Sequence, residues 1–166
     1  LSGNLPHWRQ QGVAYFVTFR LSDSLPQAKL RQWLVERDAW HIAHPEPHDE
    51  ATRREYYQLF PERLQDWLDA GYGSNVLARP DIKSLVETAL RRFDGVRYQL
   101  LESVVMPNHV HALIVPQGEH TLSEILHSWK SYTSHEINKL LSKKGDNWQQ
   151  ESFDHIVRNA EQLERI

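Results

Sequence analysis

Two histidines separated by one residue, His109 and His111, are the clearest candidates for chemistry in this sequence. They begin the apolar run HVHALIV, which is typical of a β-strand. In a strand, residues two positions apart point to the same face, and a rise of roughly 3.3 Å per residue places their Cβ atoms about 7 Å apart. Two imidazoles at this spacing can bind one cation. Two core histidines bonded to backbone carbonyls are the alternative, but the pair favours a metal site.

A helical pattern from Thr121 to Leu141 carries a second pair of functional side chains. At about 100° per residue, one apolar stripe contains Leu122, Ile125, Leu126, Trp129 and Leu140. Glu136 falls inside this stripe, and Tyr132 lies at its edge one turn earlier. A carboxylate directed into a core is costly unless it is paired or bound to a metal, so we expect Glu136 to join the two histidines. An ion pair with Lys139, Lys143 or an arginine elsewhere in the chain is the alternative for Glu136. A solvated hydroxyl is the alternative for Tyr132.

A tyrosine beside a divalent cation suits one type of reaction. The phenol oxygen is a serviceable nucleophile once it is deprotonated or hydrogen-bonded. The cation polarises a phosphoryl oxygen and orients it. Together they favour transesterification at a phosphodiester, with transfer of the phosphate to the tyrosine.

The segments that carry these residues resemble a known family. MPNHVHALIVP is similar to the HUH motif of HUH endonucleases, and WKSYTSHEINKLL resembles the nucleophile helix of single-tyrosine (Y1) transposases of the insertion-sequence 200/605 type. HWRQQGVAYFVTFRL near the start and WQQESFDHIVRNAEQLERI at the end resemble REP-associated tyrosine transposases, bacterial chromosomal relatives of those enzymes. The likeness extends over nearly the whole chain.

The resemblance implies an RRM-like antiparallel sheet with packed helices, the HUH endonuclease fold. It implies cleavage and rejoining of single-stranded DNA that carries an imperfect palindrome, a REP-like hairpin, through a 5′-phosphotyrosine. It assigns His109, His111 and Glu136 as ligands of Mg²⁺ or Mn²⁺. It assigns Tyr132 as the nucleophile. It also implies a monomer or homodimer in the bacterial cytoplasm, associated with the nucleoid.

Other polar residues near these motifs are candidates for DNA contacts or for support of the metal ligands. Asn108, Lys130, His155 and Arg158 form this group, and a solvated or structural role is the alternative for each. Arg20, Arg97 and Arg158 could line a groove or form ion pairs, and Trp8, Trp148 and Phe153 could stack on bases or belong to the core.

The order of elements indicates an α+β fold. We expect strands at 14–21, 97–105, 109–115 and 153–157. We expect helices at 26–40, 51–70, 80–93 and 121–141, and another from Ala160 onward. This order predicts one domain over residues 1–166 with a helical insertion at about 41–75, and a truncated C-terminus because the last helix is cut short.

Composition narrows the function classes. The 166 residues include 19 Lys and Arg and 22 Asp and Glu, for a net charge of −3, which excludes a broadly basic DNA-coating surface. The absence of cysteine excludes thiolate metal sites and disulfides. No apolar run approaches the ~20 residues that span a bilayer.

Two further functions stay open at this point. The first is a domesticated module that binds single-stranded or hairpin DNA without cleaving it. The second is a metal nuclease in which water attacks the phosphate. An adduct between protein and DNA distinguishes the transposase from both.

Overall fold

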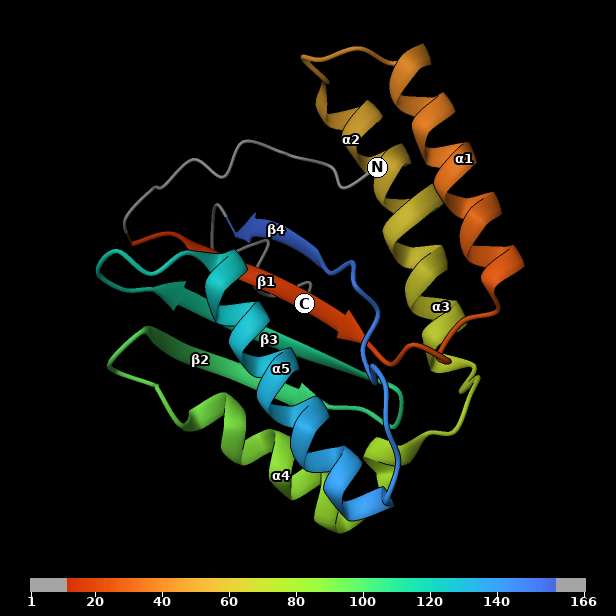
Figure 1. Cartoon of the computed structure of the whole chain (residues 1–166). Helices are drawn as coiled ribbons and strands as arrows, with labels where there is room; N and C mark the ends of the chain where they lie inside the picture. The colour runs from red at the N-terminus through yellow and green to blue at the C-terminus, as the bar shows by residue number, and fades with distance from the viewer. Residues whose placement is uncertain (1–11, 158–166) are drawn as a thin grey trace. The chain divides into compact units, whose positions relative to one another are not determined.

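The computed structural model describes residues 12–157, which form two compact units (Figure 1). One unit spans residues 23–75, and the other combines the chain before and after it. The helix predicted from Ala160 lies outside the described residues. Among residues 12–157, no helix is both long enough and apolar enough to cross a membrane.

The larger unit is built on a four-stranded antiparallel sheet. Its strands are β1 (Ala14–Arg20), β2 (Tyr98–Val105), β3 (His109–Pro116) and β4 (Phe153–Val157), in the order β2-β3-β1-β4. With helices α4 (Pro80–Arg91) and α5 (Leu122–Leu141), and without the unit at 23–75, the chain follows a β-α-β-β-α-β path. The predicted α+β class and RRM-like sheet are confirmed.

Local chemistry sets the ends of the elements that surround the histidines. The turn between β2 and β3 is closed by a bond from the Met106 amide to the His109 carbonyl oxygen. Helix α5 begins with a capping box, in which Thr121 and Glu124 each bond the other's backbone amide. It ends at Ser142, which adopts a left-handed conformation. Pro80 opens α4 at a position where no amide hydrogen is needed.

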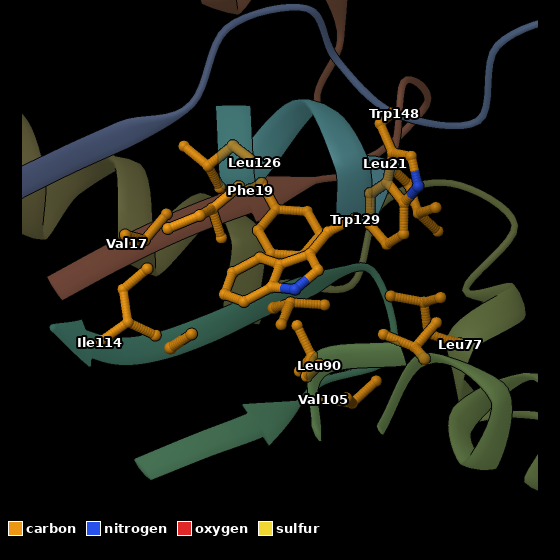
Figure 2. Close-up of a cluster of buried hydrophobic side chains, with 14 of the residues drawn as sticks. Val17, Phe19, Leu21, Leu77, Leu90, Val105, Ile114, Leu126, Trp129 and Trp148 are labelled. Carbon is orange, nitrogen blue, oxygen red and sulfur yellow. The ribbon is translucent and has the colours of Figure 1, made fainter. Parts of the chain in front are cut away.

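One face of the sheet carries the core of this unit. Figure 2 shows Val17 and Phe19 of β1 and Ile114 of β3 directed toward Trp129 and Leu126 of α5. The same cluster contains Val110, Ala112, Ile82, Val86, Leu90, Leu122, Ile125 and Ile137. Because side chains alternate along a strand, the residues between these on β1 and β3 point to the opposite face.

The unit at 23–75 has its own apolar centre. It contains α1 (Gln27–Ala43), α2 (Glu50–Tyr57), a π-helical turn (Gln58–Glu62) and α3 (Arg63–Asp69). Phe60 packs edge-on against Trp33 and Trp40 of α1. These contacts tie α1 to the later helices, so the compact unit begins at Asp23 and not near residue 41. Pro61 lacks the amide hydrogen of a regular turn and sits in the π-helical one.

A hydrogen-bonded chain connects α5, β2 and α4 through the core. The indole nitrogen of Trp129 donates to the Tyr98 hydroxyl at 3.0 Å, and this hydroxyl donates to the Leu90 carbonyl oxygen. Tyr98→Phe removes the hydroxyl and leaves two buried groups without a partner. We predict that the free energy of unfolding falls by about 1–3 kcal/mol, measured by urea denaturation with tryptophan fluorescence.

Tyr132→Phe is the matched control, because it removes the same atom from a side chain that is 42% exposed. Its free energy of unfolding should stay within about 0.5 kcal/mol of wild type. Equal losses in both variants would contradict a special role for the Tyr98 hydroxyl.

Candidate metal and nucleic-acid site

The two predicted histidines lie side by side on β3, on the face opposite α4 and α5. His109 is only 1% exposed, and His111 is half-buried. Their ring centroids are 4.8 Å apart, and the ring planes are nearly perpendicular at 81°. Phe16 of β1 stacks on His111 at 5.2 Å, so an aromatic ring supports the pair from the neighbouring strand.

Each imidazole is held through its Nδ1 atom. In His109 this nitrogen lies 2.7 Å from Oδ1 of Asn108, and in His111 it lies 2.7 Å from the hydroxyl of Thr18. Because an amide oxygen only accepts, Nδ1 of His109 carries the proton, and Nε2 of the neutral ring carries the lone pair. Metal-binding histidines commonly show this arrangement, in which the second ring nitrogen is fixed by a hydrogen bond. The pair therefore fits two ligand positions of a divalent cation.

Glu136 does not complete this site within the chain. Residues 12–157 contain no group of three His, Asp or Glu side chains close enough to share an ion. Glu136 pairs with Lys139 at 3.2 Å, and its side chain is 27% exposed. The stripe that contains Glu136 loses its cover toward the end of α5, where Leu140 is exposed. The ion pair considered above is thus what the structure contains.

Tyr132 is also separated from the histidines. It lies on α5, and the Arg92 guanidinium packs over its ring at 5.4 Å. Helix α5 contacts the sheet through the face that carries Val110 and Ala112, whereas His109 and His111 point the other way. The structure therefore does not bring Tyr132 or Glu136 of this chain to the histidine pair, contrary to the expected convergence.

The other candidates have different surroundings. Asn108 is buried and orients His109. Lys130 donates to the carbonyl oxygens of Gln149 and Gln150, at 2.9 and 3.2 Å. His155 of β4 lies on the histidine face, where its ring is 5.2 Å from Phe16, and burial lowers its pKa. Trp148 belongs to the core, whereas Arg158 and Trp8 lie outside the described residues.

Two residues of β1 join the site, Thr18 without a local sequence signal and Arg20 as one of the groove candidates. Thr18 bonds His111, and Arg20 lies directly opposite His109 in the β1–β3 register. Arg20 is 1% exposed, and its guanidinium lies 5.0 Å from the Phe153 ring centroid. Burial lowers the pKa of Arg20 to about 10, although the charge of Glu151 acts in the opposite direction. Arg97, the other groove candidate, stacks on Phe93 at 3.8 Å instead.

Comparison with known proteins identifies the family. The model of the family described as "Transposase IS200 like" matches residues 71–165, more than half of the chain, including the histidine pair and α5. The chain belongs to the IS200-like transposase family. The resemblance drawn from the motifs is thus confirmed for the family. No curated protein matches this transposase-family chain.

Two solved structures are similar to this transposase-family chain. One is a REP-associated tyrosine transposase bound to a REP hairpin, with 14% identity and a TM-score of 0.48 over 94% of this chain. This chain spans 62% of the length of that protein. The other is a "putative transposase" from Deinococcus radiodurans R1, with 11% identity, a TM-score of 0.49, and coverage of 92% of this chain and 84% of that one.

Removal of the Asn108 side chain tests the support of the histidine pair. Asn108→Ala leaves Nδ1 of His109 without its acceptor, so the ring loses its fixed orientation and proton position. We predict that the Kd for Mn²⁺ rises about 10–100-fold, measured by paramagnetic resonance titration. His127→Ala, which removes an exposed imidazole from α5, should leave the Kd unchanged. Wild-type Mn²⁺ affinity in Asn108→Ala would contradict this role.

Lys130 produces a predicted pH dependence of stability. Burial lowers its pKa from 10.5 to about 8, so the folded protein releases this proton near pH 8 while the unfolded chain keeps it to about pH 10.5. Between these values the unfolded state binds more protons, and the contribution of Lys130 to stability rises with pH. The urea midpoint of wild type should therefore rise relative to that of Lys130→Met between pH 7 and pH 9.5.

Lys139→Met is the control for this measurement, because Lys139 is a largely exposed lysine on the same helix. Its midpoint should run parallel to that of wild type over the same pH range. A parallel course for Lys130→Met as well would show that its pKa is not lowered.

Proposed function

We propose that this transposase-family chain cleaves and rejoins single-stranded DNA that carries a REP-like hairpin, with Mg²⁺ or Mn²⁺ held by His109 and His111. The observation that carries the proposal is the paired imidazoles on one strand, each with Nδ1 fixed by a neighbour. Membership of the IS200-like transposase family supports DNA as the substrate. The likeness of the terminal segments to REP-associated enzymes supports the hairpin.

The residues of this chain prepare the site for phosphoryl transfer. Asn108 and Thr18 hold the two rings so that Nε2 of each could bind the cation. When bound, the cation would polarise a phosphodiester and stabilise the negative charge that develops on its oxygens. His109 is almost fully buried, so little water surrounds its imidazole. Electrostatic interactions with a phosphate bound beside it would be stronger there than in water.

The bond changes in the proposed step balance. A tyrosine oxygen attacks phosphorus, the bond from phosphorus to the 3′ oxygen breaks, and a 5′-phosphotyrosine forms. The proton lost by the phenol balances the one gained by the departing 3′-hydroxyl. Attack by that hydroxyl on the phosphotyrosine reverses the step and rejoins the strand.

Tyr132 is the proposed nucleophile, and its position restricts how it can act. It lies on the α5 side of the sheet, so it cannot reach a phosphate at His109 and His111 of the same chain while α5 stays packed. Its exposed ring is available to a second copy of the protein. We therefore propose that Tyr132 of one copy serves the histidine pair of another.

Mixing two inactive variants tests this arrangement. Tyr132→Phe lacks the nucleophile and keeps the histidines, whereas His109→Ala has the opposite defect. We predict that neither variant alone forms a covalent adduct with a labelled hairpin oligonucleotide in Mn²⁺. The mixture should recover roughly a quarter of the wild-type adduct. Half of the randomly paired dimers contain one copy of each variant, and each such dimer has one intact site where wild type has two. Denaturing gels measure the adduct, and chelator should abolish it.

The remaining outcomes discriminate between functions. An adduct in Tyr132→Phe alone would contradict Tyr132 as the nucleophile. Multiple turnover without an adduct in wild type would favour a nuclease that uses water.

A DNA-binding module without cleavage is the second candidate. The three described tyrosines of the sheet unit are Tyr15, Tyr98 and Tyr132, and none lies on the histidine face. The described residues also lack a third ligand beside the pair. Tight hairpin binding with neither an adduct nor a cleaved product, in metal or chelator, would select this function.

A further inference from the structure

Arg20 is the one buried cation that borders the histidine pair in the described part of the sheet unit. It is the last residue of β1 and pairs in register with His109. Thr18, two residues earlier, bonds His111, so the alternation of the strand puts Arg20 on the same face as both histidines. The position of its guanidinium 5.0 Å from the Phe153 ring, on the neighbouring strand, agrees with this direction.

The guanidinium is buried and has no hydrogen-bond partner within residues 12–157. The side chain is 1% exposed, and the described part of the chain offers no acceptor to Nε or to either terminal nitrogen. Glu151 acts on it only through its charge, because no hydrogen bond joins the two residues. A charge that is removed from water without a partner is costly, so a residue kept in this state requires an explanation beyond packing.

The geometry of the Arg20 guanidinium indicates which kind of ligand it can bind. Guanidinium is planar and presents its donors in a fork that matches two oxygens of a phosphate or carboxylate. The Phe153 ring lies 5.0 Å from the guanidinium carbon and offers no hydrogen-bond acceptor, so it leaves the N–H donors unused. The neighbouring imidazoles are the proposed ligands of a cation, and a phosphodiester is the anion that both would bind at once.

We propose that Arg20 binds a backbone phosphate of single-stranded DNA beside His109 and His111. The inference rests on the proposed function, since it names how that site holds its substrate. A phosphate held by Arg20 would lie beside His109 and His111, where a cation bound by the two imidazoles could polarise it. Binding requires the atoms that cover the guanidinium to move aside, so the unpaired charge is satisfied only in the complex.

Arg20→Met and Arg20→Lys test the proposal in chelator, where binding is measured without cleavage. Met keeps a flexible, unbranched apolar side chain, shorter than that of Arg, and removes the charge, whereas Lys keeps the charge without the fork. We expect Arg20→Met to keep or raise the Tm, because an unpaired buried charge is removed. We expect its affinity for a labelled hairpin oligonucleotide to fall at least tenfold in fluorescence anisotropy. The affinity of Arg20→Lys for the same oligonucleotide should lie between those of Arg20→Met and wild type.

The salt dependence of binding provides the second readout. A lost phosphate contact on a single strand should reduce the slope of log K against log salt by about 0.7 in Arg20→Met. Arg91→Met is the matched control, because Arg91 is exposed in the last turn of α4. Its Tm, affinity and slope should stay close to those of wild type.

Three results would overturn the inference. Wild-type affinity and slope in Arg20→Met would show that Arg20 holds no phosphate. A Tm lowered by several degrees, with weaker binding at an unchanged slope, would assign Arg20 a structural role. Equal losses of DNA affinity in Arg20→Met and Arg91→Met would show only a general effect of charge.

The wild-type protein distinguishes failure of the inference from failure of the proposed function. If wild type binds no single-stranded DNA, the proposed function fails whatever Arg20 does. The Tm is then measured with and without inorganic phosphate. Stabilisation of wild type but not of Arg20→Met would keep the anion site and overturn DNA as the source of its phosphate, and stabilisation of neither would overturn the site as well.

Discussion

The alternation of side chains along β3 is the constraint on which the rest of the sheet unit depends. Val110, Ala112 and Ile114 face the two helices, so His109 and His111 must face the other way. A shift of register by one residue would bury both imidazoles under α5 and expose the core. The apolar contacts with Trp129 and its neighbours therefore keep the histidines on their face without touching them.

Polar groups on both faces of this sheet are fixed by specific partners. On the helix side, the Trp129 indole and the Leu90 carbonyl meet at the Tyr98 hydroxyl. On the other side, Asn108 and Thr18 hold the two imidazoles. Arg20 is the contrast, because its guanidinium is buried and no described residue provides it with an acceptor. Neutral atoms elsewhere, among them Asn147 Oδ1 and Ser152 Oγ, are also buried without a partner. Arg20 differs because all three nitrogens of a charged group lack an acceptor within residues 12–157.

Sequence patterns predicted the elements well because their signals are local. The capping box at Thr121 and the apolar spacing of α5 defined that helix, and the apolar run HVHALIV defined β3. Which face of β3 packs against α5 was not predictable from local patterns. Both faces of β3 are rich in apolar residues, so periodicity does not tell which face α5 covers. The expectation that Tyr132 and Glu136 meet the histidines required α5 to cover the face of β3 that carries them, and α5 covers the other face. Arg20 joins the site only through long-range strand register.

The interruption of the sheet unit by residues 23–75 has a consequence for the order in which the protein folds. Thr18 and His111 are 93 positions apart, so β1 has no β3 to pair with until most of the chain has been synthesised. The inserted helices can pack earlier, because the contacts of Phe60 with Trp33 and Trp40 join segments that are close in the sequence. Contacts between distant segments are slow to form. We expect the histidine site to be among the last parts of the molecule to assemble, with β1 unpaired in the nascent chain until then.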